Sequence, residues 1–223
     1  MLTLHRAALV LPDPADPTAP SFADGAVVVR GERVEAVGPY PELAAAHPAA
    51  RVRDWGPAVL TPGLRNPYGQ RALERDYHPD PREGIGSEPL TDELVGCADE
   101  TRFGASARRG LQRMLGFGVT AVAGPFERAS VRTAVARSGL VVLPGLVALP
   151  GSAEPGVGPE ESGAGPLDPL AVLPLARAVH GRLAAGDRAD FAVFAVDDEG
   201  SSGPLPGGAL ATVLGGRLVY RRR

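Results

Sequence analysis

The sequence contains no lysine, so all 23 of its basic residues are arginine. It has a single cysteine, Cys97, and therefore cannot form an internal disulfide, which is typical of a chain in a reducing compartment. Aromatic residues make up only 5% of the chain, so Val, Leu and Ala must fill its interior. The net charge of −3 provides no long-range attraction to nucleic acid or to an anionic membrane.

Long apolar runs are also missing. No run approaches the ~20 residues needed to span a bilayer, and the first six residues lack the basic start and apolar core of a signal peptide. Cys97 is flanked by Gly96 and Ala98, which offer no base to activate its thiol, so we interpret it as a bystander. We expect a cytoplasmic chain that binds neither nucleic acid nor membrane.

The two ends of the chain have β character. Residues 27–30 and 33–37 flank Gly31-Glu32, a two-residue turn with glycine where a positive φ is favoured. Other short segments extend this pattern, with strands expected at 51–55, 58–60, 191–196, 210–214 and 217–220 and a short helix at 41–46.

The middle of the chain alternates between helix and strand. The spacing of Ala107, Leu111, Met114 and Leu115 predicts an amphipathic helix. A buried strand at 119–123 should follow, then a second helix with Val131, Ala134 and Val135 inward and Gly139 just past its end, and then another buried strand at 140–143. This rhythm is typical of a parallel α/β unit, whose strands are covered on both faces. Residues 65–104 are polar and rich in Gly and Pro and are expected to form loop and short irregular helix. Residues 150–169 are dominated by Gly, Pro, Ser and Glu, which indicates a flexible loop or an excised region, and a short helix should follow over 172–179.

Four short motifs occur in a fixed order along the chain. Val59-Leu60-Thr61-Pro62-Gly63-Leu64 ends the first β region, and Gly118-Val119-Thr120-Ala121-Val122 forms the first central strand. Residues 181–191 read Gly-Arg-Leu-Ala-Ala-Gly-Asp-Arg-Ala-Asp-Phe, and residues 214–219 read Leu-Gly-Gly-Arg-Leu-Val. In this order the motifs resemble those of the amidohydrolase superfamily, most closely the imidazolonepropionase and aminodeoxyfutalosine deaminase branch.

The resemblance implies a mixed α/β fold. A composite β-sandwich would be built from residues 1–64 and 186–223, and residues 65–185 would form an inserted remnant of a (β/α)8 barrel. A full barrel takes about 250 residues, and the inserted segment supplies less than half that number.

The family's metal ligands are missing from the matching positions. In register with Pro62-Gly63-Leu64, the family's Asp is Asn66 and its two His positions hold Tyr68 and Gln70. Neither a phenol nor an amide is a normal zinc ligand. The family's bridging ligand, where present, is a carboxylated lysine, which this chain cannot supply. We therefore expect no cofactor.

One polar cluster could replace the missing site. Asp76, His78 and Asp80 alternate, so an extended chain would place all three on one face, and Glu83 follows closely. Asp and His are legitimate ligands for zinc or iron. The segment is also polar and Pro-rich, which is typical of a solvated loop. A divalent metal would be needed only if this cluster formed a site.

The other histidines and the motif of residues 181–191, called the exit motif below, have structural interpretations. His5 and His47 lie near predicted surface turns, and His180 suits a helix C-terminus. Asp190 can accept backbone N–H bonds from the turn that precedes it.

Two functional hypotheses remain. The first is a catalytically inactive, imidazolonepropionase-like protein that acts as a binding or accessory subunit. The alternative is an active hydrolase of non-peptide C–N bonds with a rebuilt site around Asp76, His78 and Asp80. Because few helices remain to cover the two central strands, we also expect a protein partner or self-association.

Overall fold

A computed structural model describes residues 2–86, 88–90, 99–145, 166–196, 203–204 and 206–222. Cys97 and most of the expected loop at 150–169 lie outside this part of the chain. No helix within the described ranges is both long and apolar enough to cross a membrane. The chain divides into two compact units. The terminal unit contains residues 1–65, 114–121 and 168–223, and the central unit contains residues 66–113 and 122–167.

The terminal unit is built on one large sheet. Its strands from the first part of the chain are β1 (Leu2–Val10), β2 (Phe22–Arg30), β3 (Arg33–Pro39), β4 (Arg51–Asp54) and β5 (Ala58–Pro62). The last part adds β9 (Phe191–Ala195), β10 (Ala211–Leu214) and β11 (Arg217–Arg221). The order is β11-β10-β9-β5-β1-β2-β3, with β4 beside β1.

The two ends of the chain meet where β5 pairs antiparallel with β9. The register runs from Ala58 opposite Ala195 to Pro62 opposite Phe191. This confirms the expected pairing of N-terminal with C-terminal strands, and with it the composite nature of the mixed α/β fold.

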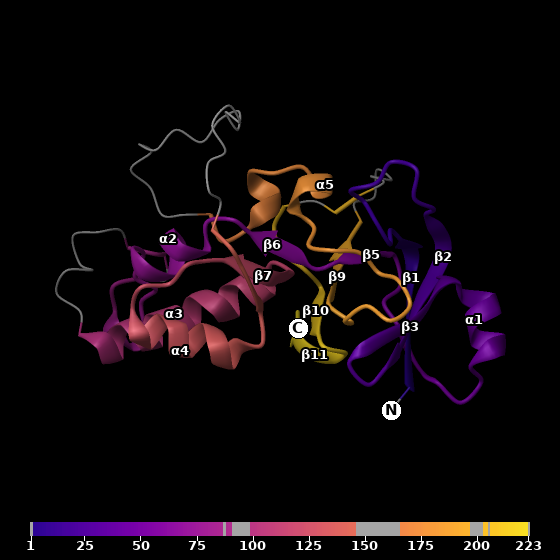
Figure 1. Ribbon diagram of the computed structural model, residues 1–223, viewed down its shortest axis with the longest axis horizontal. Coiled ribbons are helices and arrows are strands. Elements are labelled where there is room, and N and C mark those ends of the chain that lie inside the picture. The colour runs from indigo at the N-terminus through magenta and orange to yellow at the C-terminus, as the bar shows by residue number, and fades with distance from the viewer. Residues whose placement is uncertain are drawn as a thin grey trace. The chain divides into compact units, whose positions relative to one another are not determined.

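The sheet packs its main apolar core on one face and a short helix on the other. The core combines residues from both parts of the chain, including Val29 on β2, Phe191 on β9 and Val213 on β10. A Cβ atom added at Gly216 would overlap the carbonyl oxygen of Gly31, so the β10–β11 turn packs against the β2–β3 turn. On the other face, α1 (Tyr40–Ala46) lies beside β2 and β3, as Figure 1 shows, over a smaller apolar cluster.

Strand β1 was not predicted from the sequence. It pairs antiparallel with β2 along its length, parallel with β4 through Thr3–Arg6, and parallel with β5 through Leu9 and Val10. His5 is therefore a buried residue, 1% exposed, and the expectation that it lies near a surface turn is wrong.

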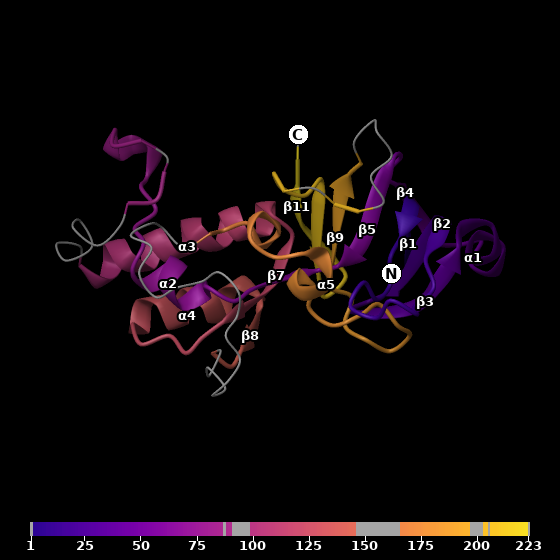
Figure 2. The ribbon, with the colours of Figure 1, turned by 90° about the horizontal axis from the view of Figure 1, so that it is seen from above.

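The rest of the chain adds a second sheet and several helices. Strands β6 (Leu64–Asn66), β7 (Val119–Ala123) and β8 (Val141–Leu143) form a three-stranded sheet in that order. The helices are α2 (Gly69–Glu74), α3 (Glu100–Gly116), α4 (Ala129–Ser138) and α5 (Leu175–Ala178), with 3-10 turns η1 (Pro81–Glu83) and η3 (Pro169–Ala171). Helices α3 and α4 run side by side in Figures 1 and 2, and a Cβ atom at Gly104 would lie 3.2 Å from the Ser130 Cβ.

Several central elements differ from the sequence-based expectation. Helix α3 begins at Glu100, inside the segment 65–104 where loop and short irregular helix are expected, and the six-residue α2 agrees with the short helix expected there. All five residues of β7 are buried, as expected, but Val142 on β8 is 51% exposed. The prediction that residues 140–143 are buried on both faces is therefore wrong. Residues 168–185, assigned to the inserted segment, cluster with the terminal unit, and the predicted domain boundaries stay a prediction.

Candidate functional site

The segment that links β5 to β6 is held tightly in the terminal unit. The Gly63 N–H donates to the Asp190 carbonyl at 3.1 Å, and the Gly63 carbonyl accepts from the His180 N–H at 2.7 Å. A Cβ atom at Gly63 would overlap the side chain of Thr120, so only glycine allows this close approach. The Pro-Gly-Leu motif at residues 62–64 therefore has a structural role, because Gly63 joins the end of β5 to the segment around His180 and Asp190.

Immediately after β6, the chain turns away from an extended path. The side-chain oxygen of Asn66 accepts the Tyr68 N–H at 2.8 Å, which forms an Asx turn. The Asn66 amide donates to the carbonyl of Pro166 at 2.9 Å, and the residue is fully buried. Tyr68 then precedes α2, and Gln70 lies within that helix. The two residues at the positions where the resemblance implies a His pair are therefore not alternate residues of a strand facing one site.

His78 is a buried residue of the central unit, 1% exposed. Its Nε2 lies 2.7 Å from the Ala72 carbonyl, and since a carbonyl only accepts, Nε2 carries the proton. Its Nδ1 is buried and has no hydrogen-bond partner among the described residues. Burial lowers the pKa of His78, and the cations Arg113 and Arg109 lower it further.

Helix α3 forms the wall behind this imidazole. The His78 backbone N–H donates to the Ser106 hydroxyl at 2.8 Å, and the Arg109 guanidinium donates to the His78 carbonyl at 2.8 Å. A Cβ atom at Gly110 would lie 2.6 Å from His78 Nε2, so the ring packs directly on the helix backbone. The expectation of a solvated loop is wrong at His78.

The two aspartates of the polar cluster have different environments. Asp76 is buried, 1% exposed, whereas Asp80 is partly exposed. Asp80 caps η1 by accepting the Arg82 N–H at 3.0 Å, and its second oxygen lies 3.5 Å from the Arg109 guanidinium. Asp80 therefore caps its own 3-10 turn and forms an ion pair with Arg109 on α3.

Glu83 forms a separate cluster with Tyr77 and Arg102. It accepts the Tyr77 hydroxyl at 2.7 Å and lies 3.3 Å from the Arg102 guanidinium. The tyrosine bond is the main cause that lowers the pKa of Glu83, with the arginine as a further cause. Within the described ranges, no three His, Cys, Asp or Glu side chains are grouped so that they could hold a metal.

The exit motif is organised by Asp190. One carboxylate oxygen accepts the Gly215 N–H at 2.7 Å, and the other lies 3.0 Å from the Arg188 guanidinium. Burial raises the pKa of Asp190, although the Gly215 bond and Arg188 oppose the shift. The bonded turn lies between β10 and β11, not before Asp190 as the sequence suggested. Asp190 and Gly215 are 25 residues apart, so no local sequence pattern could predict this contact.

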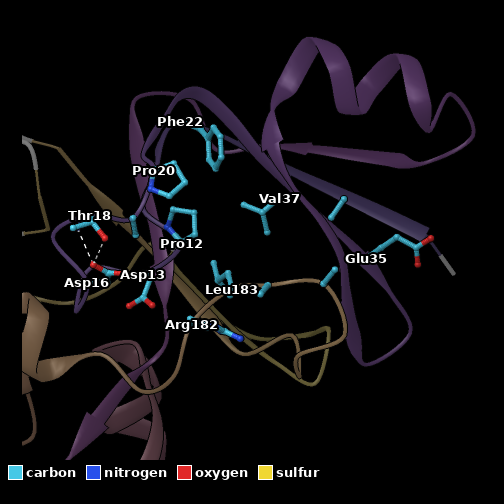
Figure 3. Close-up of a pocket in the computed structure, with 14 residues that line it drawn as sticks. Pro12, Asp13, Asp16, Thr18, Pro20, Phe22, Glu35, Val37, Arg182 and Leu183 are labelled. Carbon is cyan, nitrogen blue, oxygen red and sulfur yellow. Dashed lines mark hydrogen bonds between the residues drawn. The ribbon is translucent and has the colours of Figure 1, made fainter.

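The terminal unit also contains an open pocket that sequence reasoning missed. Its volume is about 640 Å³. Three segments line it: the β1–β2 connection, the middle of β3, and the exit motif (Figure 3). Its lining residues are Pro12, Asp13, Asp16, Thr18, Ala19, Pro20, Phe22, Glu35, Ala36, Val37, Arg182, Leu183, Ala184 and Ala185. These segments are far apart in the sequence, so no local sequence motif could predict the pocket.

Comparison with known proteins places the resemblance on part of the terminal unit. Residues 25–50, which cover most of β2 with β3 and α1, match the family model of the imidazolonepropionase-like composite domain of bacteria. This confirms the predicted resemblance over those residues. No curated protein matches the chain.

Several solved structures are similar to part of this chain at low sequence identity. Ochratoxinase from A. niger is 20% identical with a TM-score of 0.44, over 65% of this chain and 30% of that protein. Guanine deaminase from Bradyrhizobium japonicum is 19% identical with a TM-score of 0.45, over 65% and 35%. Aminofutalosine deaminase from Helicobacter pylori is 18% identical with a TM-score of 0.43, over 64% and 32%. The chain thus spans about a third of the length of each.

Proposed function

We propose that this chain is a catalytically inactive binding or accessory protein built on an imidazolonepropionase-like composite domain. The observation that carries the proposal is the Asx turn at Asn66. It directs the chain into α2, so that Tyr68 and Gln70 stand in the places of the family's His pair without the extended geometry that would aim two ligands at one ion. With no lysine in the sequence, a carboxylated lysine is excluded as well.

The remaining features of the proposal follow from the same residues. A protein of this kind needs no cofactor and, with a single cysteine, suits the cytoplasm. Val142, 51% exposed on the outer strand of the three-stranded sheet, supports an association with a protein partner or a second copy of the chain. Light scattering on dilute purified protein tests the second copy, and a monomer at every concentration would leave only the protein partner.

A second candidate function is an active hydrolase of non-peptide C–N bonds, and one observation favours it. His78 has its Nε2 proton fixed by the Ala72 carbonyl and a buried Nδ1 without a described partner. Metal-binding histidines are oriented in this way, with one ring nitrogen donating to a carbonyl and the other free to bind. Against this, the cationic side chains of Arg109 and Arg113 lower the pKa of His78 and would also repel a divalent ion.

Elemental analysis of the purified protein separates the two functions. Protein expressed with and without added zinc, iron or manganese is analysed by mass spectrometry, and ammonia release from amino-substituted and amide-containing heterocycles is followed in parallel. The matched variants are His78→Gln and His180→Gln, since His180 is also partly buried but lies outside residues 76–83. The proposal predicts substoichiometric metal and no turnover for all three proteins.

The opposite result is equally clear. About one metal ion per chain, retained in His180→Gln and lost in His78→Gln, would establish the hydrolase in place of the inactive protein. Ammonia release that is lost with His78→Gln in the absence of metal would have the same consequence, because it would identify His78 as a general base.

A further inference from the structure

The pocket of the terminal unit is assembled by backbone hydrogen bonds between its three walls. The Leu183 N–H donates to the Pro12 carbonyl at 2.8 Å, which joins the exit motif to the β1–β2 connection. Val34 on β3 donates to the Asp187 carbonyl at 2.9 Å, and its carbonyl accepts the Gly186 N–H at 2.9 Å. The cavity is therefore fixed by the fold, and its volume of about 640 Å³ falls within the range of small-molecule sites.

The interior of the pocket is apolar. Phe22, Val37 and Leu183 line it and also pack against the main core of the sheet. Pro12 and Pro20 add rigid apolar surface, and Figure 3 shows these side chains around the open space. Apolar surface that is held open in this way favours a ligand with a hydrocarbon or aromatic body.

The charges at the pocket differ in whether they are neutralised. Glu35 forms a two-fold ion pair with Arg30, at 2.7 and 2.9 Å, and Arg182 lies 3.6 Å from Asp187. Asp13 and Asp16, which Figure 3 shows together on one wall, have no cationic partner within the described part of the chain.

The two aspartates are also preorganised. One Asp13 oxygen accepts the Ala15 N–H at 3.3 Å, and one Asp16 oxygen accepts both the N–H and the hydroxyl of Thr18 at 2.8 and 2.7 Å. A further bond from the Asp16 N–H to the Asp13 carbonyl holds the two residues in one turn. Among the described residues the second oxygen of each carboxylate accepts no hydrogen bond, so it is available to another donor, and this wall carries two carboxylates that form no ion pair there.

From this geometry we infer that the pocket binds a small organic cation, a protonated amine carried on an apolar body. The body occupies the space lined by Phe22, Val37 and Leu183, and the ammonium group donates to Asp13 and Asp16. An anion of the same shape is repelled by the same two carboxylates. The inference goes beyond the proposed function, because the pocket is formed by other residues and does not depend on whether residues 66–83 are catalytic.

The test compares three probes of the same shape: phenylbutylamine, phenylbutanol and phenylbutyrate. Binding to the full chain is measured by nuclear magnetic resonance titration and calorimetry, up to about 10 mM probe. We expect the amine to bind most tightly, the alcohol more weakly and the carboxylate least, and the amine to weaken as salt is raised.

Charge-removing variants identify the site. Asp13→Asn and Asp16→Asn keep the acceptor oxygens that cap the turn, and each should weaken amine binding up to about fivefold without changing alcohol binding. Ala185→Trp, on an exposed wall, should block all probes. Glu42→Gln removes an exposed carboxylate from α1 outside the pocket and should change nothing.

Three results would overturn the inference. They are no amine binding at the highest concentration, equal binding of amine and carboxylate, and amine binding that survives both Asp variants and Ala185→Trp. None of these results bears on metal content or on ammonia release, so a failure here is distinguishable from a failure of the proposed function.

Discussion

His5 should make the terminal unit sensitive to acid. Its imidazole is 1% exposed, stacks on Trp55 and meets the edge of Phe191. Its Nδ1 accepts the indole N–H of Trp55 at 3.3 Å. Burial, with a smaller contribution from the charge of Arg53, lowers the pKa of His5 from 6.5 to about 3.

The sign and size of the effect follow from linkage. Between pH 6.5 and 3 the unfolded chain binds a proton at this site and the folded chain does not, so acid favours unfolding. The free energy of unfolding contributed by neutral His5 is fully present above pH 6.5 and is lost as the pH falls toward 3. The lowered pKa contributes roughly 5 kcal/mol in total to the free energy of unfolding, and about 2 kcal/mol of this contribution is lost between about pH 7 and pH 5.

The variant His5→Gln tests this by removing the titration while keeping an acceptor for Trp55. Urea unfolding followed by circular dichroism gives the free energy of unfolding of both proteins at pH 7, 6 and 5. The wild-type value minus the variant value should fall by about 2 kcal/mol over this range. His78 and His180, whose pKa values are also lowered by burial, titrate in both proteins and cancel in the difference.

Trp55→Phe serves as the control. It removes the indole donor and should cost about 1 kcal/mol at every pH, yet leave the pH dependence, because burial and not the hydrogen bond is the main cause of the shift. Parallel curves for wild type and His5→Gln between pH 7 and 5 would refute the reasoning and show that His5 is charged or solvated in the folded chain.

Other predictions concern the residues and strands that hold distant parts of the chain together. Gly63→Ala should destabilise the chain by about 1–3 kcal/mol through overlap with Thr120, whereas Gly203→Ala, with open space around it, should be neutral in the same urea titration. Asn66→Ala should cost about 1–3 kcal/mol by removing the Asx turn, and unchanged stability would contradict the role given to that turn. A chain ending at residue 185 loses the strand that pairs with β5 and should be insoluble or molten, so a cooperative thermal transition would contradict the composite sheet.

The sequence by itself determined the elements whose signals are local. The β2–β3 hairpin could be predicted because Gly31 permits the left-handed turn that the flanking Val-rich strands require. The motif order implied that both ends share a sheet, and the pairing of β5 with β9 agrees. The sequence also showed the absence of lysine, the residues Tyr68 and Gln70 where the resemblance implies metal ligands, and Asp76, His78 and Asp80 as polar candidates.

Only the tertiary structure decided which polar residues are buried and what they contact. β1 escaped prediction because its central position depends on three neighbouring strands that arrive from later in the chain. His5 and His78 look like surface residues in sequence, yet long-range packing removes both from water and lowers both pKa values. The pocket beside Asp13 likewise exists only because distant segments are joined by backbone bonds. Burial is a property of the whole fold, whereas periodicity reports only the nearest residues along the chain.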